Sequence, residues 1–418
     1  MDGKQLRRSK KPTSAKVLLD EVANNEQLKE DMNVLPSNYN FEVVKTIWRV
    51  RQLGCKHVAL QFPEGLLIYS CALADILEKY TGCETLIMGD IAYGACCVDD
   101  FTAKELGCDM LVHYGHSCLV PIQETQGIQM LYIFVDIHLN TERVIDSVQH
   151  NFKPGSSLAL ISTIQFVRAL QELKTRLETK SESGDGYTIH IPQCKPLSPG
   201  EVLGCTSPRL PKDVDALLYL GDGRFHLESA MIANPSVPAF QYDPYSNRMT
   251  KETYDFGRMT KLRHDSIETA KRAKRFGVIL GTLGRQGNTK IYENLQRKLL
   301  TAGKQCLFVL MSEIFPAKLE QFKDVDCWVQ VACPRLSIDW GESFRKPLLT
   351  PYELMAALGT CQYKTDSYPM DYYANESAGP WTNNHESNRP PRPARTKPKQ
   401  ATSLSPTNAC CAEQPVGN

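Results

Sequence analysis

Three cysteines in distant parts of the chain stand among small and polar residues, where a thiolate could bind a metal. Their sequence contexts are Tyr93-Gly94-Ala95-Cys96, Gly204-Cys205-Thr206-Ser207-Pro208 and Ala332-Cys333-Pro334-Arg335. Thiolates are soft ligands, and three of them can hold an iron-sulfur cluster with one iron left open. Buried, unreactive cysteine is the alternative at each position. The separations are 109 residues (96 to 205) and 128 residues (205 to 333), so only the fold could bring the sulfurs together.

Two other groups of side chains could also bind a metal. His113, His116 and Cys118 could contribute to a zinc site, but no second ligand pair stands at zinc-finger spacing. Cys410 and Cys411 near the end of the chain could act as ligands, although an exposed, unstructured pair is the simpler interpretation. Neither group matches a complete metal-binding motif.

Three glycine-containing polar loops are candidates for binding a small ligand. Each stands at the carboxyl end of a predicted strand, and each could be purely structural. The third loop also precedes a helix, where backbone amides and the helix dipole favour an anion. The third loop matches neither the Walker pattern nor the dinucleotide fingerprint, so a tight turn is its alternative interpretation. The candidate binding residues are Pro63, Glu64, Gly65, Gly221, Asp222, Gly223, Gly284, Arg285 and Gly287.

The elements that must position these loops form a unit that recurs three times. Each copy reads as strand, turn, helix, strand and a further strand, which is typical of a right-handed crossover with parallel strands. The first strands span 57–62, 158–163 and 276–281, and the further strands span 110–114, 216–220 and 327–332. A repeat slightly longer than one hundred residues can bury its own core, which predicts three small α/β domains. One large doubly wound sheet is the alternative.

The repeat gives a domain plan for the whole chain. We expect a basic, partly disordered segment over 1–36, α/β domains over 37–150, 151–265 and 266–373, and a disordered tail over 374–418. The tail contains Pro390-Pro391-Arg392-Pro393 and has too few apolar residues to fold. The basic residues between 4 and 11 are interpreted as a solvated tail, with a nuclear import signal as the alternative.

Composition restricts the classes of function. The 418 residues are 42% hydrophobic, and 48 basic and 47 acidic residues leave a net charge of +1, which argues against nucleic acid or a membrane surface as partner. We find no apolar run near 18 residues and no secretory signal. The sequence therefore predicts a soluble cytoplasmic protein, also nuclear if the basic cluster is an import signal. In a reducing compartment, 15 cysteines cannot form a disulfide framework.

The cysteine motifs, with Val329-Gln330-Val331, Pro63-Glu64-Gly65 and Gly221-Asp222-Gly223-Arg224-Phe225-His226, resemble a known family. The chain is similar, from about Leu35 to Tyr373, to the diphthamide biosynthesis enzymes that make 2-(3-amino-3-carboxypropyl)histidine. The resemblance implies three homologous α/β domains packed around a shared site, each giving one cysteine to a [4Fe-4S] cluster. The implied ligands are Cys96, Cys205 and Cys333, whereas Cys97 is not one.

The resemblance also implies a reaction and a set of partners. S-adenosylmethionine would bind at the open iron and accept an electron from the reduced cluster. A 3-amino-3-carboxypropyl radical would then add to a histidine of translation elongation factor 2, leaving methylthioadenosine. The polar loops would hold the amino acid and ribose portions of S-adenosylmethionine. Arg285 or Arg335 could pair with its carboxylate, and a surface ion pair is the alternative for either. The implied partners are a paralogous second subunit in a heterodimer and a small iron-binding electron-donor protein.

Two other functions remain open at this stage. A non-redox transferase would use the glycine-rich loops for a nucleotide and its cysteines only as core residues. A cluster-bearing scaffold subunit would hold iron but would not cleave S-adenosylmethionine without its partner.

Overall fold

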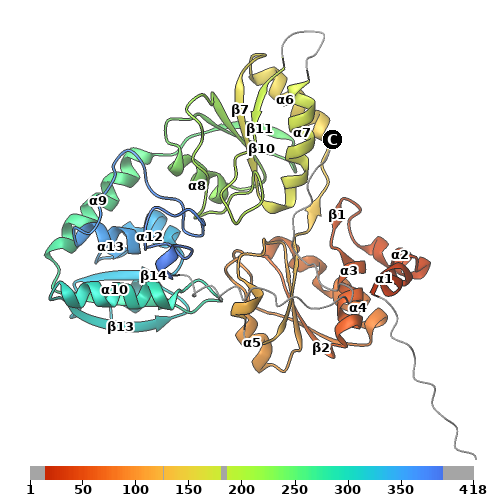
Figure 1. The fold of residues 1–418 in the computed structure, drawn as a ribbon, viewed down its shortest axis with the longest axis horizontal. Helices are drawn as coiled ribbons and strands as arrows, with labels where there is room; N and C mark the ends of the chain where they lie inside the picture. The colour runs from red at the N-terminus through yellow and green to blue at the C-terminus, as the bar shows by residue number, and fades with distance from the viewer. Residues whose placement is uncertain (1–14, 126, 180–185, 389–418) are drawn as a thin grey trace, which may run out of the picture. The chain divides into compact units, whose positions relative to one another are not determined.

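The computed structural model describes residues 15–125, 127–179 and 186–388, which contain three separate sheets (Figure 1). In each sheet the strand that comes first in the chain lies second, so the strand order 2-1-3-4 is repeated, and the second sheet adds one antiparallel edge strand. The first sheet contains β3 (Glu84–Ile87), β2 (His57–Gln61), β4 (Met110–Tyr114) and β5 (Gln129–Ile133). The second contains β8 (Thr188–His190), β7 (Ser157–Ser162), β9 (Ala216–Leu220), β10 (Ala239–Asp243) and antiparallel β11 (Arg248–Glu252). The third contains β13 (Gln305–Met311), β12 (Arg275–Gly281), β14 (Cys327–Val331) and β15 (Leu348–Leu349).

The remaining elements are helices and one short ribbon. The helices are α1 (Ala15–Ala23), α2 (Glu26–Asp31), α3 (Val43–Leu53), α4 (Ser70–Thr81), α5 (Asp100–Glu105), α6 (Thr141–Asn151), α7 (Val167–Glu178), α8 (Phe225–Ala233), α9 (Phe256–Arg272), α10 (Thr289–Thr301), α11 (Pro316–Leu319), α12 (Pro334–Trp340) and α13 (Pro351–Ala357). The 3₁₀ helices are η1 (Met32–Val34), η2 (Glu64–Tyr69), η3 (Ile122–Glu124), η4 (Ile164–Phe166), η5 (Gly341–Ser343) and η6 (Glu386–Asn388). The ribbon pairs β1 (Tyr39–Asn40) with β6 (Asp136–Ile137). No helix in the described ranges is long and apolar enough to span a membrane.

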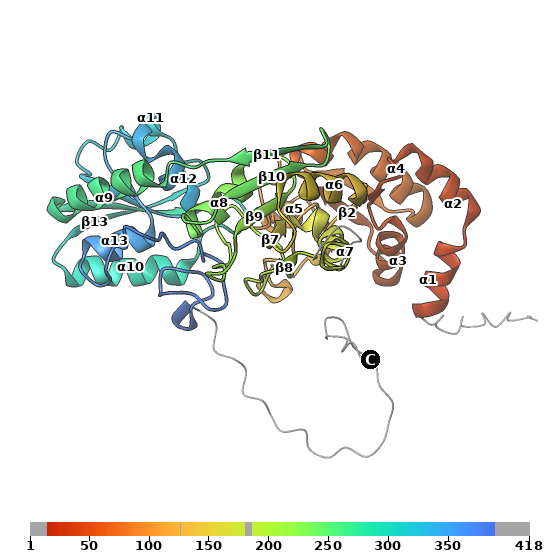
Figure 2. The ribbon, with the colours of Figure 1, turned by 90° about the horizontal axis from the view of Figure 1, so that it is seen from above.

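Each sheet buries both of its faces under helices, because neighbouring residues of a strand point to opposite sides. Val58 and Leu60 of β2 pack with α3 and α4, whereas Ala59 packs with Ala103 of α5. The second sheet repeats this arrangement, with α6 and α7 on one face and α8 on the other (Figure 1). In the third sheet α10 and α11 lie on opposite sides of β13 (Figure 2). The predicted fold class, three α/β units with parallel sheets flanked by helices, is confirmed.

One aspartate marks the same position in all three repeats. Asp109, Asp215 and Asp326 each stand directly before the third strand of their unit, and each carboxylate accepts backbone N–H groups at the start of the first strand. The donor–acceptor distances are 2.6 Å and 3.0 Å from Lys56 and His57, 2.8 Å from Ser157, and 2.9 Å and 2.8 Å from Lys274 and Arg275. These bonds lower the pKa of Asp109 and Asp326. The aspartates therefore align the amino-terminal edge of each sheet.

The leading helices of the second and third units, α6 and α9, lie before or across the predicted domain breaks. The helices α3, α6 and α9 precede the first strands and join the cores behind them, for example through Val148 of α6 and Ala270 of α9. The predicted break at 150/151 falls at the end of α6, and that at 265/266 falls inside α9. Residues 15–36 also pack, since Val22 and Leu28 lie in the first core.

The described part of the expected tail packs as well. The ring centroid of Trp381 lies 5.1 Å from that of Tyr352, and the Asn388 amide donates to the carbonyls of Pro380 and Thr382 at 2.9 Å and 2.8 Å. Residues 374–388 are therefore folded, because one aromatic anchor and one amide compensate for the lack of aliphatic residues. The basic cluster between 4 and 11, the proline-rich run, Cys410 and Cys411 lie outside the described residues.

Candidate functional site

The Cys96 loop joins β3 to α5 at the carboxyl edge of the first sheet. Gln61, the last residue of β2, donates its amide to the Cys97 carbonyl at 2.8 Å. A turn from the Cys97 N–H to the Gly94 carbonyl, at 2.9 Å, closes the loop. Asp99 then caps α5 by accepting from the Thr102 N–H at 3.3 Å. These contacts fix the two ends of the loop and leave the segment with Cys96 between them.

The glycine-rich loop after β12 holds the Cys96 loop from the third sheet. The Arg285 N–H donates to the Cys96 carbonyl at 2.8 Å, and the Gln286 amide donates to Cys97 Sγ at 3.5 Å. Gly284 has a φ of +53°, and a Cβ there would lie 2.7 Å from the backbone of Cys97. Glycine is required by both its conformation and the close approach. We call residues 284–286 the glycine clamp.

The Arg285 side chain completes this contact instead of facing a ligand. Its Nε donates to a carboxylate oxygen of the fully buried Asp100 at 2.8 Å, and its guanidinium lies 4.1 Å from the ring centre of Phe101. A bidentate pair with a buried carboxylate is a strong, directional contact. Gly284 and Arg285 therefore join the third sheet to the first. Gly287 packs its backbone against the Gly281 carbonyl.

The Cys205 loop is a tight turn in which Leu203 and Thr206 exchange backbone hydrogen bonds of 2.9 Å and 3.2 Å. A Cβ on Gly204 would lie 2.0 Å from the Phe225 ring, so only glycine fits there. The segment 370–373 pairs with the turn as a short strand. In that pairing Ser207 N–H donates to the Met370 carbonyl at 2.8 Å and Tyr372 N–H to the Cys205 carbonyl at 3.2 Å.

Cys333 precedes α12 and is linked to the Cys205 loop by Arg335. The Arg335 guanidinium is 2% exposed and donates to the carbonyls of Gly204 at 3.1 Å and Phe225 at 2.6 Å. It also pairs with the carboxylates of Glu228 at 2.6 Å and Asp339 at 2.9 Å. The pKa of Arg335 is raised because these carboxylates outweigh its desolvation. Arg335 is therefore neither a surface residue nor accessible to a ligand carboxylate.

The thiols of Cys96, Cys205 and Cys333 lie close enough to influence one another's pKa. The pKa of Cys96 is raised well above 9 by its hydrogen bond with Cys97, by burial and by the other two thiols. Burial and Cys333 raise the pKa of Cys205 to about 12, and burial raises that of Cys333. The pKa of Cys97 falls to about 7, chiefly through its hydrogen bond with Cys96. All of these cysteines are free thiols.

This donor set fits an iron-sulfur cluster better than a single ion. Among the described residues, no group of three His, Cys, Asp or Glu side chains is placed to hold one metal ion. Thiolates on a cluster each bind a different iron, so they need not surround one point. His113 Nδ1 donates to Gln61 Oε1 at 2.7 Å and Cys118 is exposed, so the described residues do not assemble the alternative zinc site.

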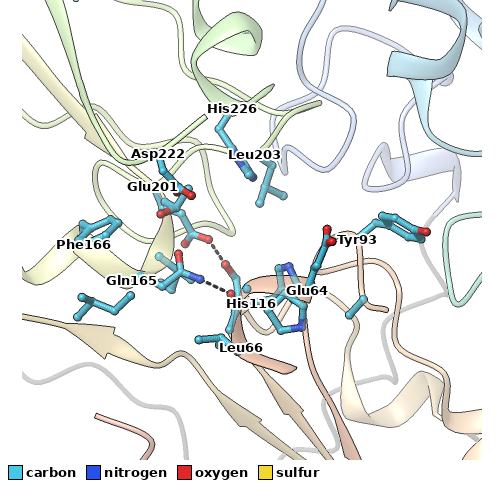
Figure 3. A pocket seen from close by; sticks show the side chains of 18 of the residues that line it. Glu64, Leu66, Tyr93, His116, Gln165, Phe166, Glu201, Leu203, Asp222 and His226 are labelled. Carbon is cyan, nitrogen blue, oxygen red and sulfur yellow. Dashed lines mark hydrogen bonds between the residues drawn. The ribbon is translucent and has the colours of Figure 1, made fainter. Parts of the chain in front are cut away.

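A cavity of about 440 Å³ lies between the first and second sheets, beside the Cys96 and Cys205 loops. Figure 3 shows Glu64, Tyr93 and His116 on the side of the first sheet and Glu201, Asp222 and His226 on the side of the second. Of the predicted binding residues, Pro63, Glu64, Gly65 and Asp222 line the cavity. Gly221 and Gly223 flank Asp222. Gly284 and Arg285 belong to the glycine clamp and Gly287 follows it, and none of the three lines the cavity.

Burial sets the charge of the cavity wall. The pKa of Glu201 rises to about 7, and that of His226 falls to about 4. The pKa of His116 falls well below 6.5, since burial and the neighbouring histidines His113 and His226 disfavour its cation. Glu201 contacts the Ser117 hydroxyl and accepts from the Ser198 N–H at 2.9 Å. At neutral pH the histidines are therefore neutral.

Sequence reasoning missed several residues of this site. Glu201 and Asp100 resemble ordinary surface carboxylates in the sequence, and only their burial distinguishes them. Tyr372 and Tyr373 lie far in sequence from Cys96, Cys205 and Cys333, although they end the stretch that resembles the known family. No local signal connects either tyrosine with the cysteine loops.

The fold and the site define the class of protein: three repeated α/β units, each with a free cysteine in a loop that follows one of its parallel strands. The chain belongs to the diphthamide synthesis protein family, whose model matches residues 62–369. It is 62% identical over 384 residues to 2-(3-amino-3-carboxypropyl)histidine synthase subunit 1 of Caenorhabditis elegans, covering 92% of this chain and 96% of that protein. It is 53% identical to the human protein of the same name, covering 99% and 94%.

A solved structure has the same fold. Dph2 from Pyrococcus horikoshii, in a crystal structure with a 4Fe-4S cluster, is 28% identical with a TM-score of 0.64, covering 78% of this chain and 93% of that chain. The expected family is thus confirmed by sequence and by fold.

Proposed function

We propose that this chain is the catalytic subunit of a 2-(3-amino-3-carboxypropyl)histidine synthase, which performs the first step of diphthamide biosynthesis. It would transfer a 3-amino-3-carboxypropyl group from S-adenosylmethionine to a histidine of translation elongation factor 2 and release methylthioadenosine. The observation that carries the proposal is the electrostatic interaction of the Cys96 thiol with those of Cys205 and Cys333, each on a loop that follows a strand of a different sheet. The names of the relatives and the cluster of the archaeal structure support it.

In this proposal the three thiolates bind a [4Fe-4S] cluster and leave one iron open. When bound and reduced, the cluster supplies the electron that breaks the bond between the sulfonium and the aminocarboxypropyl carbon. The glycine clamp and Arg335 hold the cysteine loops in place, so they act through the ligands and do not touch the substrate.

The cavity beside the Cys96 and Cys205 loops would receive S-adenosylmethionine. The carboxylates of Glu64 and Asp222 suit its ammonium group and ribose hydroxyls, and the backbone of Pro63 and Gly65 allows a close approach. The neutral side chains of His116 and His226 add no positive charge that would repel the sulfonium. The wall is therefore suited to a cationic ligand.

The proposed assembly is a heterodimer with the paralogous subunit 2, served by a small iron-binding electron donor. We propose cytoplasmic action on the elongation factor, with nuclear entry if the basic cluster between residues 4 and 11 is an import signal.

The test is anaerobic purification with the partner subunit, followed by iron and sulfide analysis. Dithionite and S-adenosylmethionine are then added and methylthioadenosine is measured. Cys96→Ala, Cys205→Ala and Cys333→Ala should each abolish the visible absorbance of the cluster, whereas Cys97→Ala should leave it near normal. A colourless wild-type protein would contradict the proposal, and a cluster without methylthioadenosine would indicate a scaffold subunit.

A further inference from the structure

The hydroxyl of Tyr372 is buried at the cysteine site without a protein partner. Tyr372 is 6% exposed, and its hydroxyl has no hydrogen-bond partner among the described residues. An unsatisfied buried hydroxyl costs about 1–3 kcal/mol, and native proteins rarely retain one. The Tyr372 hydroxyl therefore needs a hydrogen-bond acceptor that the described residues do not supply.

The position of Tyr372 identifies where that acceptor must lie. Its N–H donates to the Cys205 carbonyl at 3.2 Å, and its ring packs edge-on against Tyr373 with centroids 5.3 Å apart. Burial raises the pKa of Tyr372, and the thiols of Cys205, Cys333 and Cys96 raise it further, so the hydroxyl lies within electrostatic range of all three. Tyr372 is the only tyrosine of the described ranges whose buried hydroxyl has no hydrogen-bond partner.

We propose that the Tyr372 hydroxyl donates a hydrogen bond to a sulfur of the cluster held by Cys96, Cys205 and Cys333, and thereby raises the reduction potential of the cluster. This inference rests on the proposed function, because it requires the cluster to be present. Reduction adds negative charge to the cluster sulfurs, and a donor aimed at them stabilises the reduced form. In this proposal Tyr372 adjusts the potential of the cluster through a hydrogen bond, and no proton leaves it.

The experiment compares Tyr372→Phe with a matched control, Tyr368→Phe. Tyr368 is buried four residues earlier, but its hydroxyl donates to Glu353 at 2.9 Å, and Thr350 lies 3.2 Å away. Both variants are reconstituted anaerobically, their iron and sulfide are counted, and their clusters are titrated reductively by electron paramagnetic resonance. We expect full iron in both, a more negative midpoint potential in Tyr372→Phe, and a wild-type potential in Tyr368→Phe.

Proton-deuteron exchange gives a second readout that needs no turnover. An exchangeable proton coupled to the reduced wild-type cluster should disappear from the electron-nuclear double resonance spectrum of Tyr372→Phe and persist in Tyr368→Phe. If Tyr372→Phe holds no iron, 3,5-difluorotyrosine at position 372 keeps the ring and strengthens the donor, and its cluster should titrate at a more positive potential.

The outcomes separate this inference from the proposed function. Wild-type protein without iron would refute the cluster itself. A wild-type cluster with an unchanged potential in Tyr372→Phe, or in the difluorotyrosine protein where that one is needed, would show that water satisfies the hydroxyl and would overturn the inference alone.

Discussion

Comparing Gly284→Ala with Gly303→Ala should show how much the glycine clamp contributes to stability, beyond the cost of placing alanine in a left-handed conformation. Gly284 and Gly303 both have positive φ, +53° and +68°, but a Cβ on Gly303 meets nothing within 4 Å. Forcing alanine into this conformation costs about 1–2 kcal/mol at either site. Only at Gly284 would the new Cβ lie 2.7 Å from the Cys97 backbone.

The extra cost at Gly284 follows from that collision. Backbone cannot rotate away like a side chain, so the Cys96 loop must shift, which adds about 1–3 kcal/mol of overpacking. The shift also weakens the 2.8 Å bond from Arg285 N–H to the Cys96 carbonyl, worth about 1 kcal/mol. We expect Gly284→Ala to be less stable than Gly303→Ala by about 2–4 kcal/mol, and to bind less iron because Cys96 is displaced.

The measurements are urea denaturation of the apoproteins and iron per chain after anaerobic reconstitution. Gly303→Ala should keep wild-type iron. If the two variants unfold at the same urea concentration and hold equal iron, the clamp does not position Cys96 and the reasoning is refuted.

Three further predictions concern the other contacts of the site. Glu201→Gln should remove one pH dependence of stability. Burial raises the pKa of Glu201 from 4.5 to about 7, so its contribution to the free energy of unfolding is fully present below pH 4.5 and falls by roughly 3 kcal/mol towards pH 7. Denaturation curves of the variant should lack this loss. Arg335→Lys should destabilise by about 3–5 kcal/mol and lower iron content, since lysine cannot pair with both Glu228 and Asp339. Asp222→Ala should raise the KM for S-adenosylmethionine about tenfold or more with little change in kcat, measured by methylthioadenosine release.

Buried strands and capped helices could be predicted closely. The predicted spans of β4 and β9 match the structure residue for residue. The two strands are continuous apolar runs buried on both faces, and α10 starts where the Asn288 side chain accepts from the Lys290 and Ile291 N–H groups. In these elements the local pattern and the tertiary environment agree.

Elements defined by distant contacts could not be predicted. The strand β15 has only two residues, and its sole neighbour is β14, so no periodicity reveals it. The helix α9 continues across the predicted break because its buried Arg263 pairs with Glu353, ninety residues later, at 2.7 Å. A composition-based boundary cannot detect such a pairing.

In the candidate site, too, the local motifs could be predicted and the distant contacts could not. The cysteine positions followed from motifs that resemble a family, but the contacts that join the loops did not. Arg285 meets Asp100 across 185 residues and Arg335 meets the Gly204 carbonyl across 131. Both arginines were expected to face a ligand or solvent, since a sequence does not reveal which cations are already paired.

The repeats are alike in fold but unequal in the site they build. Cys96 and Cys205 lie on loops that follow the second strands, β3 and β8, whereas Cys333 follows the third strand, β14. The third unit also supplies the glycine clamp and Arg335, which hold the other two cysteine loops. A symmetric arrangement would give each loop the same support. Here the third unit positions all three thiols. A substitution that displaces its loops should therefore disrupt the cysteine site even where the first two sheets remain folded.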